Sequence, residues 1–90
     1  MTTFDFDDGN GPVPAHKHPK GGGWVADTAT VDETAYVGAE AQVFGNAQVF
    51  NNAEVFGDAE VFGNAGVFGN AKVFGNAKVS GDAWIVTGKQ

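Results

Sequence analysis

The sequence contains no cysteine, so neither a disulfide nor a thiolate metal site can stabilise this chain of 90 residues. It also lacks an apolar run near the ~20 residues of a membrane span. No charged segment followed by an apolar one opens the chain, as a signal peptide would require. We therefore expect a cytoplasmic protein (in the host cytoplasm if the protein is viral) without a membrane partner.

Basic residues are scarce, because 5 Lys+Arg stand against 11 Asp+Glu and give a net charge of −6. Broad affinity for nucleic acid needs a basic surface, so we expect no binding of bulk nucleic acid. The charge is uneven along the chain, since residues 23–64 contain acidic residues and no lysine. The chain therefore runs from acidic to mildly basic.

One six-residue motif recurs through most of the sequence. Ala opens every unit after the first, Val or Ile stands third, and Gly-Asn or Gly-Asp usually closes the unit. The first four residues alternate like a strand, and the closing pair tolerates the positive φ of a turn. Because this period matches no helix and hairpins would leave long open edges, the pattern predicts a solenoid of short parallel strands. From Gly23 the units are GWVADT, ATVDET, AYVGAE, AQVFGN, AQVFNN, AEVFGD, AEVFGN, AGVFGN, AKVFGN, AKVSGD and AWIVTG.

These units resemble the hexapeptide-repeat family, in which a small residue follows an aliphatic one four positions later, as in Val43–Ala47, Val55–Ala59 and Val73–Ala77. The resemblance implies an all-β, left-handed parallel β-helix of triangular cross-section with three units per coil. It would have about 3.5 coils over residues 23–90, preceded by an irregular, extended N-terminal arm over residues 1–22. The GGGWV opening is similar to that of small phage and bacterial members.

Charges support a register in which residues eighteen apart are neighbours. Glu54 then lies beside Lys72, and Glu60 beside Lys78, so both pairs have opposite signs.

Phenylalanine stands on the opposite side of each strand from valine, so we expect its ring to point outward. Stacking between coils would contribute roughly 0.5–1.5 kcal/mol per ring pair. So many outward rings exceed what a monomer normally exposes, and they predict self-association. The family's usual assembly is a homotrimer with parallel axes, which would bury such columns. The predicted columns are Phe44 with Phe62, Phe50 with Phe68, and Phe56 with Phe74.

Both ends of the solenoid carry distinctive aromatic residues. Trp24 lies in the first unit and Trp84 in the last, where they are predicted to cap the ends. Phe4 and Phe6 alternate with Asp5 in the arm, which would cover an aromatic column of its own or of a neighbouring subunit. If the caps are imperfect, head-to-tail stacking makes a polymer-forming structural protein an alternative.

The arm also holds the one cluster with both histidines. Zinc needs a further ligand that the neighbouring sequence does not supply, so we predict no metal site. An anion site, helped by open N–H groups at Gly21–Gly23, and a solvated linker remain alternatives. With aromatic faces that stack on nucleobases, such a site would let a phage-type protein sequester a small nucleotide-derived ligand. Candidate ligand-binding residues are His16, Lys17, His18, Lys20, Trp24, Tyr36, Lys72 and Lys78.

Enzymes of this family include acyltransferases and zinc carbonic anhydrases, and the resemblance implies that their sites use histidines on the coils and an inserted loop. The units of this chain contain neither histidine nor cysteine, and no insertion interrupts them. We therefore expect no enzymatic activity and no cofactor. The prediction is a non-catalytic homotrimeric scaffold or binding module.

Overall fold

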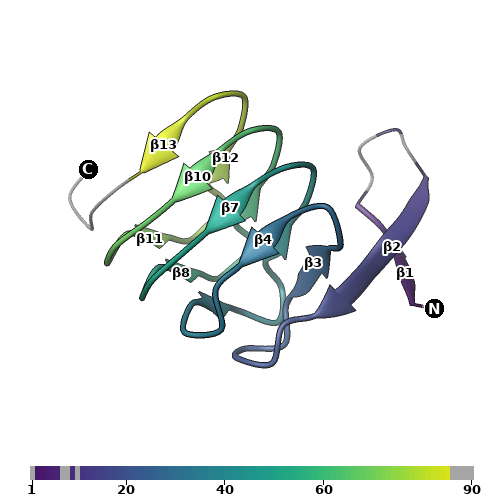
Figure 1. Ribbon diagram of the computed structural model, residues 1–90, viewed down its shortest axis with the longest axis horizontal. Coiled ribbons are helices and arrows are strands. Elements are labelled where there is room, and N and C mark those ends of the chain that lie inside the picture. The colour runs from purple at the N-terminus through teal and green to yellow at the C-terminus, as the bar shows by residue number, and fades with distance from the viewer. Residues whose placement is uncertain (1, 7–8, 10, 86–90) are drawn as a thin grey trace.

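A computed structural model describes residues 2–6, 9 and 11–85 of the chain. The described residues form an all-β structure without a helix, in which short strands stack in successive turns (Figure 1). Residues 86–90, the end of the predicted β-helix domain, lie outside the described residues. The strands are Thr3–Asp5 (β1), Pro12–Lys17 (β2), Trp24–Ala26 (β3), Thr30–Val31 (β4), Tyr36–Val37 (β5), Gln42–Val43 (β6), Gln48–Val49 (β7), Glu54–Val55 (β8), Glu60–Val61 (β9), Gly66–Val67 (β10), Lys72–Val73 (β11), Lys78–Val79 (β12) and Trp84–Ile85 (β13).

The strands from β3 onward form three parallel sheets, which are the three sides of the coil. Side 1 contains β3, β6, β9 and β12; side 2 contains β4, β7, β10 and β13; side 3 contains β5, β8 and β11. Partners are eighteen residues apart, as Lys72 and Glu54 or Lys78 and Glu60 show. The predicted parallel β-solenoid and its register are therefore confirmed, with about three turns in the described chain.

The interior of the coil is built from the first and third residues of each unit. Alternation along a strand turns both toward the axis, where only small side chains fit. Seven of the valines are fully buried and form, with the alanines, one continuous core. These valines are Val25, Val37, Val43, Val49, Val55, Val61 and Val67.

Glycines stack at the corners because the chain turns there with positive φ. Gly45, Gly63 and Gly81 follow one another at the corner between sides 1 and 2, with φ of 69°, 68° and 62°. A Cβ on Gly45 would lie 2.9 Å from the backbone nitrogen of Gly63. Asn51 takes the same conformation, with φ of 64°, where its unit has asparagine in place of glycine.

Asp32 anchors the turn that contains Asn51. Its carboxylate accepts hydrogen bonds from the N–H of Thr34 (3.3 Å) and from the N–H of Asn51 one coil further on (3.2 Å). These backbone hydrogen bonds, from Thr34 first and from Asn51 second, lower the pKa of Asp32 below its ordinary value of 3.8. The carboxylate thus joins two successive coils.

Replacing Asp32 by Asn should lower the melting temperature at pH 6 and have little effect near pH 2. Because the pKa of Asp32 is lowered in the folded state, its contribution is fully present above 3.8 and is lost as the pH falls through the folded value. Thermal unfolding of both proteins between pH 2 and 6 measures this difference. A difference that stays constant across this range would contradict the role of the carboxylate.

The N-terminal arm is more regular than its composition indicates. Strand β1 pairs antiparallel with β2, and β2 pairs antiparallel with β3, so the hairpin extends side 1 at the N-terminal end of the coil (Figure 1). Phe4, Phe6, Val13 and Ala15 belong to a second, smaller apolar cluster between hairpin and coil. This packing orders a segment that glycine and proline alone would leave irregular.

Candidate functional site

All three predicted phenylalanine columns form on the outside of the coil. The ring centroids are 5.0 Å apart on side 1 and 5.3 Å apart on sides 2 and 3, and each pair is stacked. Each column therefore shields much of its own apolar surface, as stacked rings in neighbouring rungs do. The pairs are Phe44 with Phe62, Phe50 with Phe68, and Phe56 with Phe74.

The hairpin covers the column of side 1. Phe6 stacks on Phe44 with centroids 4.8 Å apart, and Phe4 stacks on Trp24 at 4.7 Å. Phe6 and Phe44 are each only 4% exposed. Phe44 thus lies in the outer column as predicted, and of the two predicted roles of the arm the structure shows the first, the covering of an aromatic column of its own chain.

The columns of sides 2 and 3 end in exposed aromatic residues. Phe74 is 57% exposed on side 3. On side 2, Trp84 is 55% exposed, although its ring lies 4.8 Å from that of Phe68. Gly66 makes room for both rings, since a Cβ there would lie 3.0 Å from each of them. Among the described residues, the exposed large apolar side chains are Tyr36, Phe74 and Trp84; all three lie on these two sides, and the two most exposed lie toward the C-terminal end.

His16 and Lys17 contact different neighbours on side 1. His16 Nδ1 lies 2.7 Å from an oxygen of Asp27, and both side chains are about half exposed. The ammonium of Lys17 lies 5.5 Å from the centre of the Trp24 ring, in a cation–π contact. These two residues therefore help to hold β2 on the first coil.

His18 and Lys20 instead hold the following loop against side 3. The buried His18 ring has Nε2 2.7 Å from the carbonyl of Ala35, and Lys20 donates to the carbonyl of Thr34 at 3.2 Å. The N–H groups of Gly22 and Gly23 are not open, because they donate to the carbonyls of His18 and Val37. The four basic residues of the arm thus have four different partners instead of one shared anion site.

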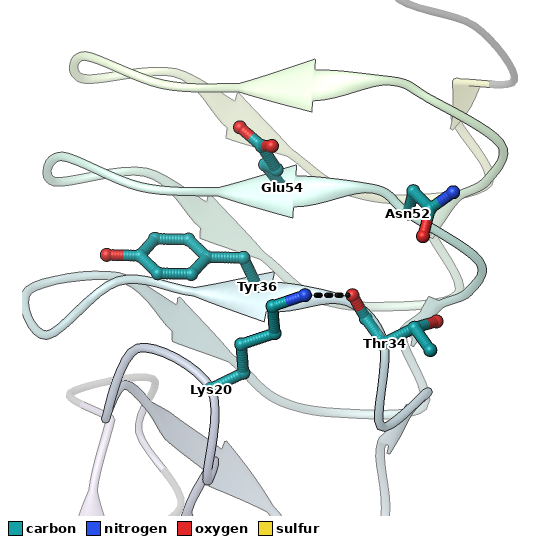
Figure 2. Close-up of a pocket in the computed structure, with 5 residues that line it drawn as sticks. All are labelled: Lys20, Thr34, Tyr36, Asn52 and Glu54. Carbon is teal, nitrogen blue, oxygen red and sulfur yellow. Dashed lines mark hydrogen bonds between the residues drawn. The ribbon is translucent and has the colours of Figure 1, made fainter.

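A cleft of about 400 Å³ lies on side 3, lined by Lys20, Thr34, Tyr36, Asn52 and Glu54. Figure 2 shows the Lys20 side chain extending from the arm to Thr34 of the first coil, on which Tyr36 also lies, with Asn52 and Glu54 one coil further on. The cleft offers a cation, a carboxylate, an amide and an aromatic face. This set suits a small ligand with both hydrogen-bond donors and acceptors better than a purely anionic one.

Sequence reasoning identified two of the cleft residues, Lys20 and Tyr36, and missed the other three. The eighteen-residue register was the available signal, since it places Glu54 beside Tyr36 and Asn52 beside Thr34. The other two candidate lysines of the coil do not line the cleft, although Lys72 lies beside its residue Glu54. Lys72 is 3.7 Å from Glu54 on side 3, and Lys78 stands beside Glu60 on side 1.

Comparisons with protein-family models, with curated proteins and with solved structures find no match to this chain. Within the described residues, no three His, Cys, Asp or Glu side chains are grouped so that they could hold a metal ion. The described part of the chain likewise has no helix of the length and apolarity needed to cross a membrane.

Proposed function

We propose that the protein is a non-catalytic scaffold or binding module that works as a homotrimer packed through sides 2 and 3. The supporting observation is the unequal covering of the three sides. The hairpin covers the aromatic column of side 1, whereas the columns of sides 2 and 3 have no such cover within the described chain and end at Trp84 and Phe74.

A closed ring of three needs two different patches on each subunit, because each contact joins one patch to the other. Sides 2 and 3 adjoin and supply these patches. Half-buried phenylalanines at Phe50, Phe56 and Phe68 would become fully buried between subunits. Burial of aromatic surface is the main stabilising term in such interfaces.

Replacing Phe74 by Lys should convert the trimer into monomers. Phe74 is 57% exposed, so the coil tolerates lysine, but a charge in an apolar interface is costly. Light scattering after size-exclusion chromatography, from 1 to 100 µM, measures the mass. The control is Gln42→Lys on side 1, which should keep the mass of the parent protein.

The proposal fails if both variants keep the parent's mass, or if the parent itself elutes as a monomer at every concentration. Circular dichroism of both variants confirms that the coil is intact, so loss of assembly is separated from loss of fold.

Binding of a small ligand is a second proposal, favoured by the cleft beside Tyr36. The cleft lies on side 3, which the proposed trimer places against a neighbour. Native mass spectrometry of the same sample, with and without added nucleotides, would reveal a retained ligand. Absence of any adduct would leave the scaffold as the sole proposal.

A further inference from the structure

Opposite charges line the cleft on side 3 without pairing with each other. Lys20 reaches the cleft from the arm and Glu54 projects from β8, and no ion pair joins the two among the described residues. The Lys20 ammonium donates one hydrogen bond, to the carbonyl of Thr34 at 3.2 Å. Because an ammonium has three N–H groups, two of them remain for another acceptor.

The Glu54 carboxylate is likewise only partly satisfied. Its ion-pair partner is Lys72 of the next coil, whose Nζ lies 3.7 Å from Oε1, which is longer than a hydrogen bond. The side chains of Glu54 and Lys72 are 41% and 53% exposed, so water screens the pair and weakens it. The second oxygen, Oε2, has no partner in the described chain, and the carboxylate can therefore accept hydrogen bonds from a ligand.

Two other cleft residues also have free hydrogen-bonding groups. Within the described chain, the Asn52 amide and the Tyr36 hydroxyl make no side-chain hydrogen bond. Figure 2 shows Lys20, Asn52 and Glu54 around the cleft, with the Tyr36 ring along one edge. Tyr36 is 36% exposed and offers an aromatic face. The cleft thus combines two charges of opposite sign with an amide and an apolar surface.

The signs of these charges favour a ligand that carries both. An anion would be attracted by Lys20 but repelled by Glu54, and a cation would be attracted by Glu54 but repelled by Lys20 and Lys72. An uncharged ligand would displace water from both charged groups without a charge to offer in return. A zwitterion satisfies the ammonium and the carboxylate together, through charge-assisted hydrogen bonds.

The spacing of the two charges suits a short zwitterion. Lys20 is held at Thr34 of the first coil, and Glu54 lies beside Tyr36 one rung further along the stack, about 4.8 Å away. In an α-amino acid the nitrogen lies about 2.5 Å from the carboxyl carbon. With a hydrogen bond at each end, such a molecule bridges roughly 8 Å, enough to join a cation on one coil to a carboxylate on the next.

We propose that the cleft binds a free α-amino acid with an apolar side chain. This inference names the ligand class of the small-ligand proposal above and rests on that proposal. Lys20 and the Asn52 amide hold the carboxylate of the ligand, Glu54 accepts from its ammonium, and its side chain packs against the Tyr36 ring. The cleft volume of about 400 Å³ admits a side chain as large as that of phenylalanine.

Titration of the isotope-labelled protein with L-phenylalanine, followed by NMR, tests the proposal. The amides of residues 34–36 and 52–54 should shift saturably, whereas those of residues 60–62 on side 1 should not. Because most of the lining residues are exposed and the ligand is small, we expect a dissociation constant on the order of 1 mM.

Three related ligands isolate the groups of phenylalanine that the cleft recognises. N-acetyl-L-phenylalanine lacks the ammonium, and L-phenylalaninamide lacks the carboxylate. Each should bind about ten-fold more weakly, the effect of losing one charge-assisted hydrogen bond. Glycine has both charges but no side chain for the Tyr36 ring, so it should also bind more weakly than phenylalanine.

Two variants remove the charges of the cleft one at a time. Lys20→Gln and Glu54→Gln should each raise the dissociation constant for phenylalanine about ten-fold. The matched control is Glu60→Gln, because Glu60 has the same second position in its unit but lies on side 1, outside the cleft. It should bind phenylalanine as the parent does. The spectra of the three variants also show whether the coil is intact.

Absence of a saturable shift overturns the proposal, and so does equal affinity for phenylalanine and any of the three related ligands. An equal loss of affinity in Glu60→Gln and Glu54→Gln overturns it as well, because overall charge then explains the effect. If phenylalanine does not bind but native mass spectrometry retains another adduct, the amino-acid class is wrong and the small-ligand proposal stands. If neither experiment shows binding, both proposals fail.

Discussion

Replacing Gly63 by Ala is expected to lower the free energy of unfolding by about 2–5 kcal/mol, as the sum of two costs. The first cost is the left-handed backbone, since Gly63 has φ of 68°. The second is contact between coils, since the new Cβ would lie 2.9 Å from the backbone nitrogen of Gly81. The corner would open at the centre of the stack, where coils on both sides depend on it.

Gly75→Ala separates the two costs. Gly75 has φ of 66°, but a Cβ there would meet no atom within 4 Å. We expect this variant to lose only about 1–2 kcal/mol, the cost of the backbone conformation. Chemical denaturation of both variants measures the difference, and equal losses would show that close stacking of the corners contributes nothing.

Replacing Phe6 by Ala should cost about 3–5 kcal/mol, the range for removing a buried aromatic side chain. Phe6 is 4% exposed and stacks on Phe44, so its loss would free β1 and uncover the column of side 1. Thermal or chemical unfolding gives the stability change. We also expect the variant to bind a dye for exposed apolar surface, which the parent should bind less.

Phe4→Ala is the matched control for this experiment. Phe4 lies in β1, two residues before Phe6, and stacks on Trp24, but it is only half-buried. Its removal should cost less than that of Phe6. If the order of the two losses is reversed, the cover over side 1 depends on Trp24 instead of Phe44.

The coil could be predicted from the sequence because the residues that specify its strands and turns are close together in the chain and recur in every unit. Each unit specifies a strand and a turn, and the charges of Glu54 and Lys72 set the register that the structure shows. The stacked phenylalanine columns follow from the same register. The hand of the coil has no such source in the sequence pattern and comes from the resemblance alone.

The arm and the candidate site depend on long-range contacts that no local sequence pattern predicts. Phe6 stacks on Phe44, which is 38 positions further along the chain, and the His18 ring is hydrogen-bonded to the carbonyl of Ala35. Composition therefore indicated a loop, whereas long-range stacking makes a hairpin. The histidines and lysines were grouped by proximity in sequence, but alternation along β2 and the turn after it direct them to separate partners.

The eighteen-residue register has a consequence for how such a chain can change in length. Each coil of the parallel stack pairs only with the coils directly before and after it, as Val43 pairs with Val25 and Val61. Tandem duplication of a whole coil would therefore lengthen the molecule while keeping every column in place. Duplication of one unit between Glu54 and Lys72 would instead shift all later residues by one side and separate Lys72 from Glu54. Gene duplication can therefore lengthen this solenoid and keep its columns only in steps of whole coils.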